Sequence, residues 1–278
     1  MNALSTGTAL ESFDADWQEW HAAHEKQRAH PHGFLAVTHL HWLGSEAARL
    51  EGAPGIWRVE ADVVRVVLEP GESLQPDGRE LNTEAGTTVT FGPIEERGGI
   101  NLLSGNTVIE VAKRGGEYIV RPRNPENGLL RNYQGTPAYS PDAAYAVRGT
   151  YVPFEAPRPT TVGAAVEGIQ HVYEAPGEIR FRLAGEDLAL TAFNGHAPGS
   201  LSVLFTDQTS GRTTYPANRS LSVVPAPDGA VELDFNRAVN LPCAYTDLAT
   251  CPLPPAENRL PVAIEAGEKI PYERQDKQ

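Results

Sequence analysis

The sequence contains only two cysteines, Cys243 and Cys251, separated by seven residues. So few thiols exclude a disulfide-stapled scaffold, and the closely spaced pairs that supply four zinc ligands are missing. We expect ordinary buried, reduced thiols here. A local disulfide or redox pair and a metal site stay open as alternatives.

Long apolar runs are also missing, because no segment approaches the eighteen residues of a spanning helix. The first ten residues lack the basic and apolar regions of a signal peptide, so we expect a cytoplasmic protein. Only four lysines occur, and the formal net charge is −13. This charge disfavours nucleic acid and anionic membrane surfaces as partners.

The sequence contains no phosphate-binding loop, dinucleotide fingerprint or Gly-x-Ser-x-Gly elbow. It also shows no alternation of predicted strands and helices. We therefore expect no nucleotide cofactor, and no other cofactor is indicated. The hydrophobic share of 40% is enough for a globular core.

One helix is predicted near the N-terminus. Phe13, Trp17, Trp20 and His24 follow a 3.6-residue period, which places them on one stripe facing a core. Ser12 and Asp14 are expected at its start, and Pro31 and Gly33 at its end.

Short β-prone segments separated by turn residues fill most of the remaining chain, which predicts a mainly β protein with an antiparallel meander forming a barrel or sandwich. We expect strands over residues 34–43, 56–59, 63–68, 87–91, 107–112, 117–121, 144–154, 160–167, 169–174, 178–183, 188–193, 201–206, 220–224 and 231–235. Gly115–Gly116 predicts a hairpin, and turns are predicted at Pro176–Gly177, Gly185–Glu186, Gly195–Gly199 and Pro227–Gly229.

The expected organisation is an N-terminal helical segment, two β lobes and a proline-rich C-terminal strap. A loop over residues 122–141, rich in Pro, Asn and Gly, separates the lobes. The boundaries are 1–33 for the helical segment, 34–130 and 131–239 for the lobes, and 240–278 for the strap. Prolines fix an extended path, so the strap is expected to lie against the second lobe.

The strap carries a recognisable signature: DFNRAVNLPCAY at 234–245, TCPLPPAENRL at 250–260 and IEAGEK at 264–269. Upstream lie FTDQTSG at 205–211, with TY at 214–215 and Arg219, and HWL at 41–43. The chain resembles domain-of-unknown-function family 1684, an uncharacterised bacterial and archaeal family. The resemblance implies no reaction, and His21 and His24 stand where it leads us to expect arginines.

The first candidate site follows the predicted strand 201–206. In the structural interpretation, Asp207 and Ser210 bond the backbone of a turn and Gly211 supplies its positive φ. In the functional one, arginines hold an anionic group while a carboxylate or a tyrosine of lowered pKa exchanges a proton. The side chains concerned are Asp207, Thr209, Arg212, Thr214, Tyr215 and Arg219.

The second candidate site joins Asp234 and Asn236, expected on one strand face, to Glu257, Asn258 and Arg259. A carboxylate beside an amide suits hydroxyl groups or a hard cation. Alternatively, Asp234 or Glu257 pairs with Arg259 and fixes the strap.

Histidine is concentrated early in the chain, where six of the eight residues lie between positions 21 and 41. His39 and His41 are expected on one strand face and His21 and His24 on one helix face. No cysteine or carboxylate lies at a diagnostic spacing, so no metal site is expected.

Together these patterns favour a protein that binds a small polar or anionic molecule in a pocket of the second lobe. The same pocket could also carry out acid–base catalysis, as in a hydrolase. Candidate catalytic residues are Asp207, Tyr215 and Asp234. Candidate ligand-binding residues are Arg212, Thr214, Arg219, Asn236, Glu257 and Arg259. The alternative is a non-catalytic interaction or scaffold module whose polar residues only fix the strap.

Overall fold

The computed structural model describes residues 3–76 and 87–275, and the chain divides into two compact units. Unit 1 comprises residues 1–26, 135–247 and 251–278, and unit 2 comprises residues 27–134 and 248–250. Antiparallel strands make up most of the regular structure in the described residues and helices are few, so the predicted mainly β class is confirmed. None of the helices described is long and apolar enough to cross a membrane.

Unit 2 contains two antiparallel sheets around one core. The five-stranded sheet has the order β1 (His41–Leu43), β9 (Glu117–Arg123), β8 (Thr107–Arg114), β7 (Gly99–Ser104) and β5 (Gln75–Pro76). The four-stranded sheet has the order β2 (Ala48–Arg49), β3 (Ile56–Glu60), β4 (Val63–Val67) and β6 (Thr88–Phe91). The core lies between them and contains Trp57, Val64, Val66, Ile109 and Val111.

The predicted hairpin at Gly115–Gly116 is confirmed, because Arg114 of β8 pairs with Glu117 of β9. The predicted strand over 34–43 is confirmed only at its end. It begins with a 3₁₀ turn, η1 (Phe34–Ala36), and only β1 within it is a strand. The predicted loop over 122–141 starts too early, because β9 continues to Arg123. The connection after β9 includes a single helical turn, α2 (Gly128–Arg131).

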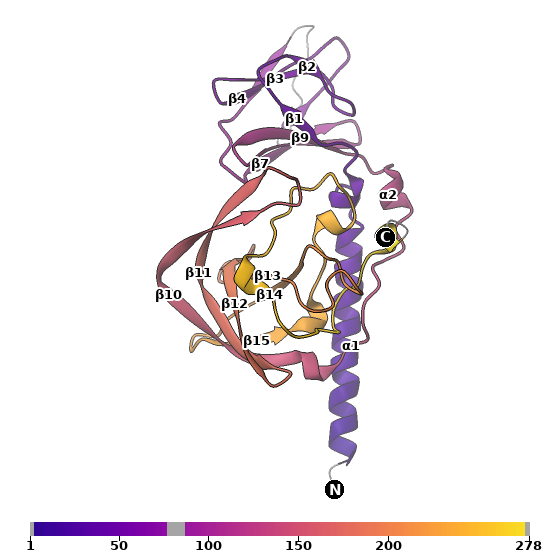
Figure 1. Ribbon diagram of the computed structural model, residues 1–278. Helices are drawn as coiled ribbons and strands as arrows, with labels where there is room; N and C mark the ends of the chain where they lie inside the picture. Colours follow the sequence, from indigo (N-terminus) through magenta and orange to yellow (C-terminus); the bar gives the residue numbers. More distant parts are fainter. Residues whose placement is uncertain (1–2, 77–86, 276–278) are drawn as a thin grey trace. The chain divides into compact units, whose positions relative to one another are not determined.

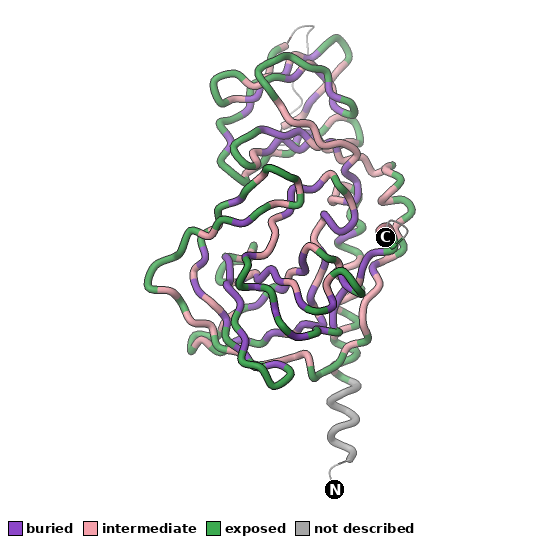
Figure 2. Tube along the Cα trace, in the orientation of Figure 1, coloured by how far each residue is buried: buried purple, intermediate pink, exposed green. Residues whose placement is uncertain are grey.

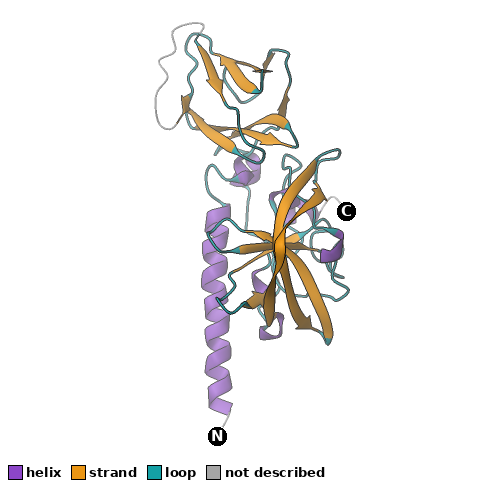
Figure 3. Ribbon diagram, turned by 90° about the vertical axis from the view of Figure 1, so that its left-hand side faces the viewer, coloured by secondary structure: helices purple, strands orange, loops and turns teal. Residues whose placement is uncertain are grey.

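Unit 1 is built on one six-stranded sheet that curves into a half-barrel (Figures 1 and 3). Its order is β14 (Arg219–Val223), β13 (Leu201–Phe205), β12 (Glu186–Asn194), β11 (Gln170–Leu183), β10 (Ala146–Gly163) and β15 (Ala230–Asp234). A 3₁₀ turn, η2 (Ala143–Tyr145), precedes β10, and η3 (Phe235–Arg237) follows β15.

Two pairs of predicted strands are single long strands. The predicted strands 144–154 and 160–167 both overlap β10, which has a register shift between Pro153 and Arg158. The predicted strands 169–174 and 178–183 both fall almost entirely within β11, which begins at Gln170. The predicted turn at Pro176–Gly177 is therefore wrong. A Cβ at Gly177 would come within 2.5 Å of the Val152 carbonyl, so this glycine permits close strand approach rather than a turn.

Alternate residues along the strands of the curved sheet are buried and build the core of unit 1. Figure 2 shows the buried residues of unit 1 in purple. Ile179 and Phe181 of β11 and Leu221 and Val223 of β14 belong to it. The segment after residue 239 completes the core with Leu260, Val262, Ile264 and Ala266.

That segment is the predicted strap, and it contains no strand among its described residues. It contains η4 (Pro242–Ala244), η5 (Ala256–Asn258) and a single helical turn, α3 (Tyr272–Gln275). Its backbone bonds the loop after β13: Leu260 N–H donates to the Thr206 carbonyl at 2.8 Å, and Gln208 N–H donates to the Val262 carbonyl at 3.0 Å. The strap thus lies against the sheet, as the sequence predicts.

The predicted N-terminal helix is α1 (Ala3–Arg28), and its half-buried stripe contains Trp17 and Trp20. Trp17 Nε1 donates to the Asn236 carbonyl at 2.8 Å, and its ring stacks on His21 with centroids 4.7 Å apart. Because the helix starts at Ala3, Ser12 and Asp14 lie inside it, and the prediction that they begin the helix is wrong.

Candidate functional site

The first predicted site is a tight loop, residues 206–218, between β13 and β14. Asp207 Oδ1 accepts hydrogen bonds from Thr209 N at 2.8 Å and Thr209 Oγ1 at 2.6 Å. Ser210 Oγ accepts from Asp207 N at 3.1 Å, and Gly211 has a φ of +78°. The turn chemistry expected from the sequence is confirmed at each of these positions.

Asp207 also forms a buried ion pair with Arg219, the first residue of β14. Arg219 Nη2 lies 2.7 Å from Asp207 Oδ2, and the two side chains are 1% and 0% exposed. The guanidinium donates to the carbonyls of Ile264 and Ala266 in the strap. Burial lowers the pKa of Arg219, and the Asp207 carboxylate opposes that shift by stabilising the charge. These contacts fasten the strap to the sheet and bury both charges away from solvent.

The other residues of this loop differ in their exposure. Thr214 is fully buried, with its hydroxyl 2.8 Å from that of Thr209, whereas Arg212 is exposed and forms no ion pair within the described residues. Tyr215 donates to the Cys243 carbonyl at 2.8 Å. Burial raises the pKa of Tyr215 to about 12, the direction opposite to the one a catalytic base needs.

The second predicted site is divided. Asp234 and Asn236 are not on one strand face, because β15 ends at Asp234 and Asn236 belongs to η3. Asp234 Oδ1 caps this turn, accepting from Asn236 N at 3.1 Å. The Asn236 amide bonds both the N–H and the carbonyl of Asp142, each at 2.9 Å. Asp234 pairs with Arg237 at 3.2 Å.

The expected pairing of Arg259 with Asp234 or Glu257 is wrong: Arg259 forms no ion pair in the part of the chain that the structure describes. Asn258 ties this part of the strap down instead. Its Oδ1 accepts from Thr191 N at 2.7 Å, and its Nδ2 donates to the carbonyls of Thr191 and Leu204. Glu257 accepts from the Thr191 hydroxyl at 3.1 Å, and Glu257 and Arg259 line a small cavity of about 260 Å³.

In the sequence, Asn258 is distinguished only as a neighbour of the charged residues Glu257 and Arg259. Its role could have been inferred from chemistry. A proline-rich strap leaves backbone groups of the neighbouring sheet unpaired, and a side-chain amide such as that of Asn258 can pair with both donors and acceptors.

The histidines between positions 21 and 41 are divided between the two units. His21 and His24 lie on α1 in unit 1, whereas His39 and His41 stack in unit 2 with ring centroids 5.4 Å apart. Among the described residues, no three His, Cys, Asp or Glu side chains are placed to hold a metal ion.

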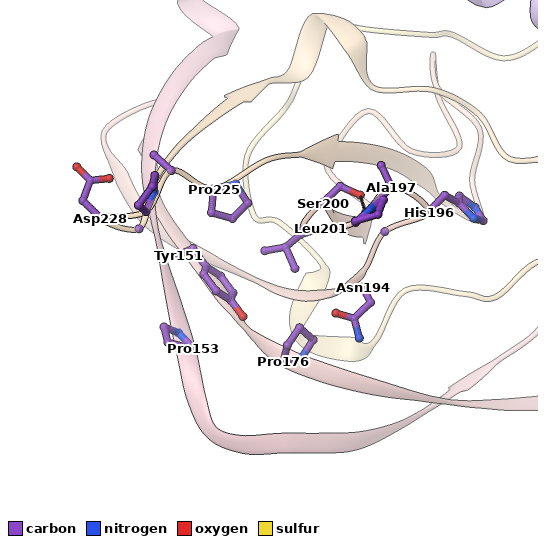
Figure 4. A pocket seen from close by; sticks show the side chains of 16 residues that line it. Tyr151, Pro153, Pro176, Asn194, His196, Ala197, Ser200, Leu201, Pro225 and Asp228 are labelled. Atoms are coloured by element: carbon purple, nitrogen blue, oxygen red, sulfur yellow. Dashed lines mark hydrogen bonds between the residues drawn. The ribbon is translucent and has the colours of Figure 1, made fainter.

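A cavity of about 820 Å³ opens elsewhere in unit 1, at one end of the half-barrel (Figure 4). Two turns form most of it: residues 194–201, between β12 and β13, and residues 225–229, between β14 and β15. Tyr151 and Pro153 of β10 and Pro176 of β11 complete the lining. The turn 225–229 is held in place because Tyr151 N donates to the Gly229 carbonyl at 2.8 Å.

The lining combines apolar rings with polar groups in similar measure. Five proline rings and Leu201 face the cavity, together with Tyr151, Asn194 and Ser200. Burial raises the pKa of Tyr151, which keeps its hydroxyl protonated as a donor. In Figure 4 this hydroxyl is turned toward Pro176 and Asn194 rather than toward Asp228.

His196 and Asp228 are the ionisable side chains of this lining besides tyrosine, and the lining contains no arginine or lysine. None of the residues predicted as catalytic or ligand-binding lies on it. The sequence predicts both turns but carries no signal that two turns, thirty residues apart, meet at the same end of the sheet.

Comparison with known proteins places this half-barrel in a family. A family model described as "Protein of unknown function (DUF1684)" matches residues 131–269, which include every residue of the cavity lining. A solution NMR structure of an uncharacterized protein from Haloarcula marismortui is 32% identical, with a TM-score of 0.43 over 50% of this chain and 78% of that one. No curated protein matches. The chain belongs to the family of proteins of unknown function DUF1684.

Proposed function

We propose that unit 1 binds a small molecule in the 820 Å³ cavity, and that this ligand is a polar ring compound of neutral or positive charge. The observation that carries the proposal is the cavity itself. Its volume and its position at the end of a half-barrel are typical of small-molecule sites. Its lining offers apolar and polar groups in similar measure.

We infer a ring in the ligand from the rings that line the cavity. Proline rings and the Tyr151 ring offer flat faces against which a planar or cyclic ligand packs. The Tyr151 hydroxyl and the Asn194 amide supply one donor and a donor–acceptor pair, which orient the polar groups of the ligand.

We infer the charge of the ligand from the ionisable residues that line the cavity. Asp228 is the only acid on the lining, no lysine or arginine opposes it, and the whole chain carries a formal charge of −13. An anionic ligand would therefore be repelled, while a cation would be attracted. The arginines that the sequence offers for an anion lie elsewhere: Arg219 is paired inside the protein and Arg212 is on an exposed turn.

The residues with acid–base chemistry are better explained as structural. Asp207 holds a turn and an ion pair, Tyr215 retains its proton, and Asp234 caps η3. We accordingly propose a binding protein in which Asp207 and Tyr215 fix the strap and Asp234 fixes the turn before it.

Three matched probes test the proposal: indole, tryptamine and indole-3-acetate share a ring and differ in charge. We expect saturation-transfer NMR to show binding of tryptamine and indole and weaker binding of indole-3-acetate, with the tryptamine signal reduced by salt. Strongest binding of the anion would contradict the proposed ligand charge.

A blocking variant locates the binding. Ala197→Trp puts a large side chain at the cavity, and Ala156→Trp makes the same change at an exposed position of β10 outside it. We expect only Ala197→Trp to abolish the tryptamine signal. An unchanged signal in Ala197→Trp would place the binding elsewhere.

A further inference from the structure

The two cysteines lie together although seven residues separate them in sequence. Cys243 is 3% exposed and Cys251 is 7% exposed. Cys243 N–H donates to Cys251 Sγ at 3.3 Å, so the Cys251 sulfur lies against the Cys243 residue. Neither residue lines the 820 Å³ cavity, so this pair is independent of the proposed binding site.

Surrounding residues hold the segment that carries the pair. Tyr215 O–H donates to the Cys243 carbonyl at 2.8 Å, and Arg274 Nη2 donates to the same oxygen at 3.1 Å. Asn218 Nδ2 donates to the carbonyl of Pro252, next to Cys251, at 2.7 Å. Both cysteines are thus fixed by contacts from outside the turn that joins them.

The environment also favours the reactive form of one sulfur. Contact with the Cys251 thiol lowers the pKa of Cys243 against the opposing effect of burial, with Tyr215 and Arg274 adding to the lowering. A thiolate is the nucleophile in sulfur chemistry, so Cys243 is the residue that reacts first.

We propose that Cys243 and Cys251 form a reversible dithiol–disulfide pair whose oxidant is a hydroperoxide. The Cys243 thiolate attacks the distal oxygen of hydrogen peroxide, forming a sulfenic acid and releasing hydroxide. The Cys251 sulfur then attacks the Cys243 sulfur, the S–S bond forms, and the hydroxyl leaves as water. In total two thiols and one peroxide give one disulfide and two waters, and an external dithiol reverses the reaction.

Burial selects the oxidant. Side chains exposed by only a few per cent admit a molecule the size of hydrogen peroxide more readily than a bulky disulfide. A zinc site is a poorer explanation of the same pair, because the described residues offer no third ligand and structural zinc takes four.

The test treats the folded full-length chain, purified with a reducing agent that is then removed, with hydrogen peroxide at pH 7. We expect wild type to lose both alkylatable thiols without forming dimers, and to recover both with dithiothreitol. Mass spectrometry should show a peptide pair linked between residues 243 and 251. Two thiols remaining after treatment, or irreversible oxidation to sulfinic acid, would overturn the proposal.

Single variants separate the roles of the two sulfurs. In Cys251→Ser the Cys243 sulfenic acid has no partner and should be trapped by dimedone, whereas Cys243→Ser should give several-fold less adduct. Equal trapping at both residues would overturn the assignment of Cys243 as the attacking sulfur.

Arg274 is a positioning residue in this scheme. We expect Arg274→Gln to slow disulfide formation several-fold at pH 7 and to shift its pH–rate profile to higher pH. Arg259→Gln, which changes an exposed arginine of the same strap, should leave both unchanged. Melting temperatures near that of wild type confirm that each variant is folded, and identical profiles for the two variants would contradict the role of Arg274.

Discussion

Replacing Arg219 with alanine tests whether the buried ion pair is what fastens the strap. The substitution removes the only cation next to the Asp207 carboxylate among the described residues. It also removes the donor to the carbonyls of Ile264 and Ala266. The perturbation therefore leaves one buried charge and two buried acceptors without their partner.

The magnitude follows from the burial of the pair. Breaking a buried ion pair by removing one partner costs about 3–5 kcal/mol. Each unsatisfied carbonyl adds about 1–3 kcal/mol if it stays dry, although water entering the space left by the guanidinium offsets part of that. We expect a loss of about 3–5 kcal/mol, a large share of the total of roughly 5–15 kcal/mol typical of a domain.

Urea unfolding followed by far-UV circular dichroism measures this loss as a shift in the midpoint. Arg212→Ala is the matched control, because Arg212 is exposed and lies in the same loop, and it should change stability by no more than about 0.5 kcal/mol. A loss below about 1 kcal/mol in Arg219→Ala, or an equal loss in both variants, would refute the structural role. It would also return Arg219 to the list of ligand-binding candidates.

Three further results are expected. Burial raises the pKa of Glu110, but Arg121 and Arg123 of β9 outweigh this effect and bring the pKa to about 2. Because this value lies below the ordinary pKa of glutamate, the ionised carboxylate stabilises the fold above about pH 4. On the order of 3 kcal/mol of that stability is lost as the pH falls from about 5 to about 2. Glu110→Gln should remove this acid dependence from the urea midpoint, and an unchanged dependence would contradict the assignment. Asn258→Asp places a carboxylate against two carbonyls and should cost about 3 kcal/mol in the same assay, whereas the exposed neighbouring change Glu257→Gln should cost less than about 1 kcal/mol. Deleting residues 240–278 should give insoluble protein, because the strap supplies part of the core, and a soluble product with a cooperative melt would show that it is an appendage.

Local patterns in the sequence predict local structure well. The aromatic stripe of α1, the Gly115–Gly116 hairpin and the Asp207 turn all depend on residues a few positions apart. Gly177 shows where this fails: its dipeptide with Pro176 has turn chemistry, but the carbonyl that it approaches belongs to a different strand. Only the tertiary structure contains that information.

The two arginines of the candidate site illustrate the same limit and one missed signal. Arg219 and Arg212 are chemically equivalent in the sequence, yet one is buried and the other exposed. The two-residue repeat of a β-strand indicates the burial of Arg219, because Arg219 lies on the same face of β14 as the apolar residues Leu221 and Val223. An arginine on a core face predicts a buried partner, and Asp207 precedes it by only twelve positions.

Within the described residues of unit 1, part of the long strand β10 has an unpaired edge, and prolines in that part reduce its tendency to pair with other molecules. β15 pairs with it only up to Thr150, so within unit 1 no other described strand pairs with that edge over residues 152–162. An open edge is a template for a strand of another molecule, and it promotes aggregation. Pro153, Pro157 and Pro159 interrupt this stretch and have no N–H to offer. The half-barrel can therefore remain open on this side, with its cavity at one end, without assembling into larger sheets.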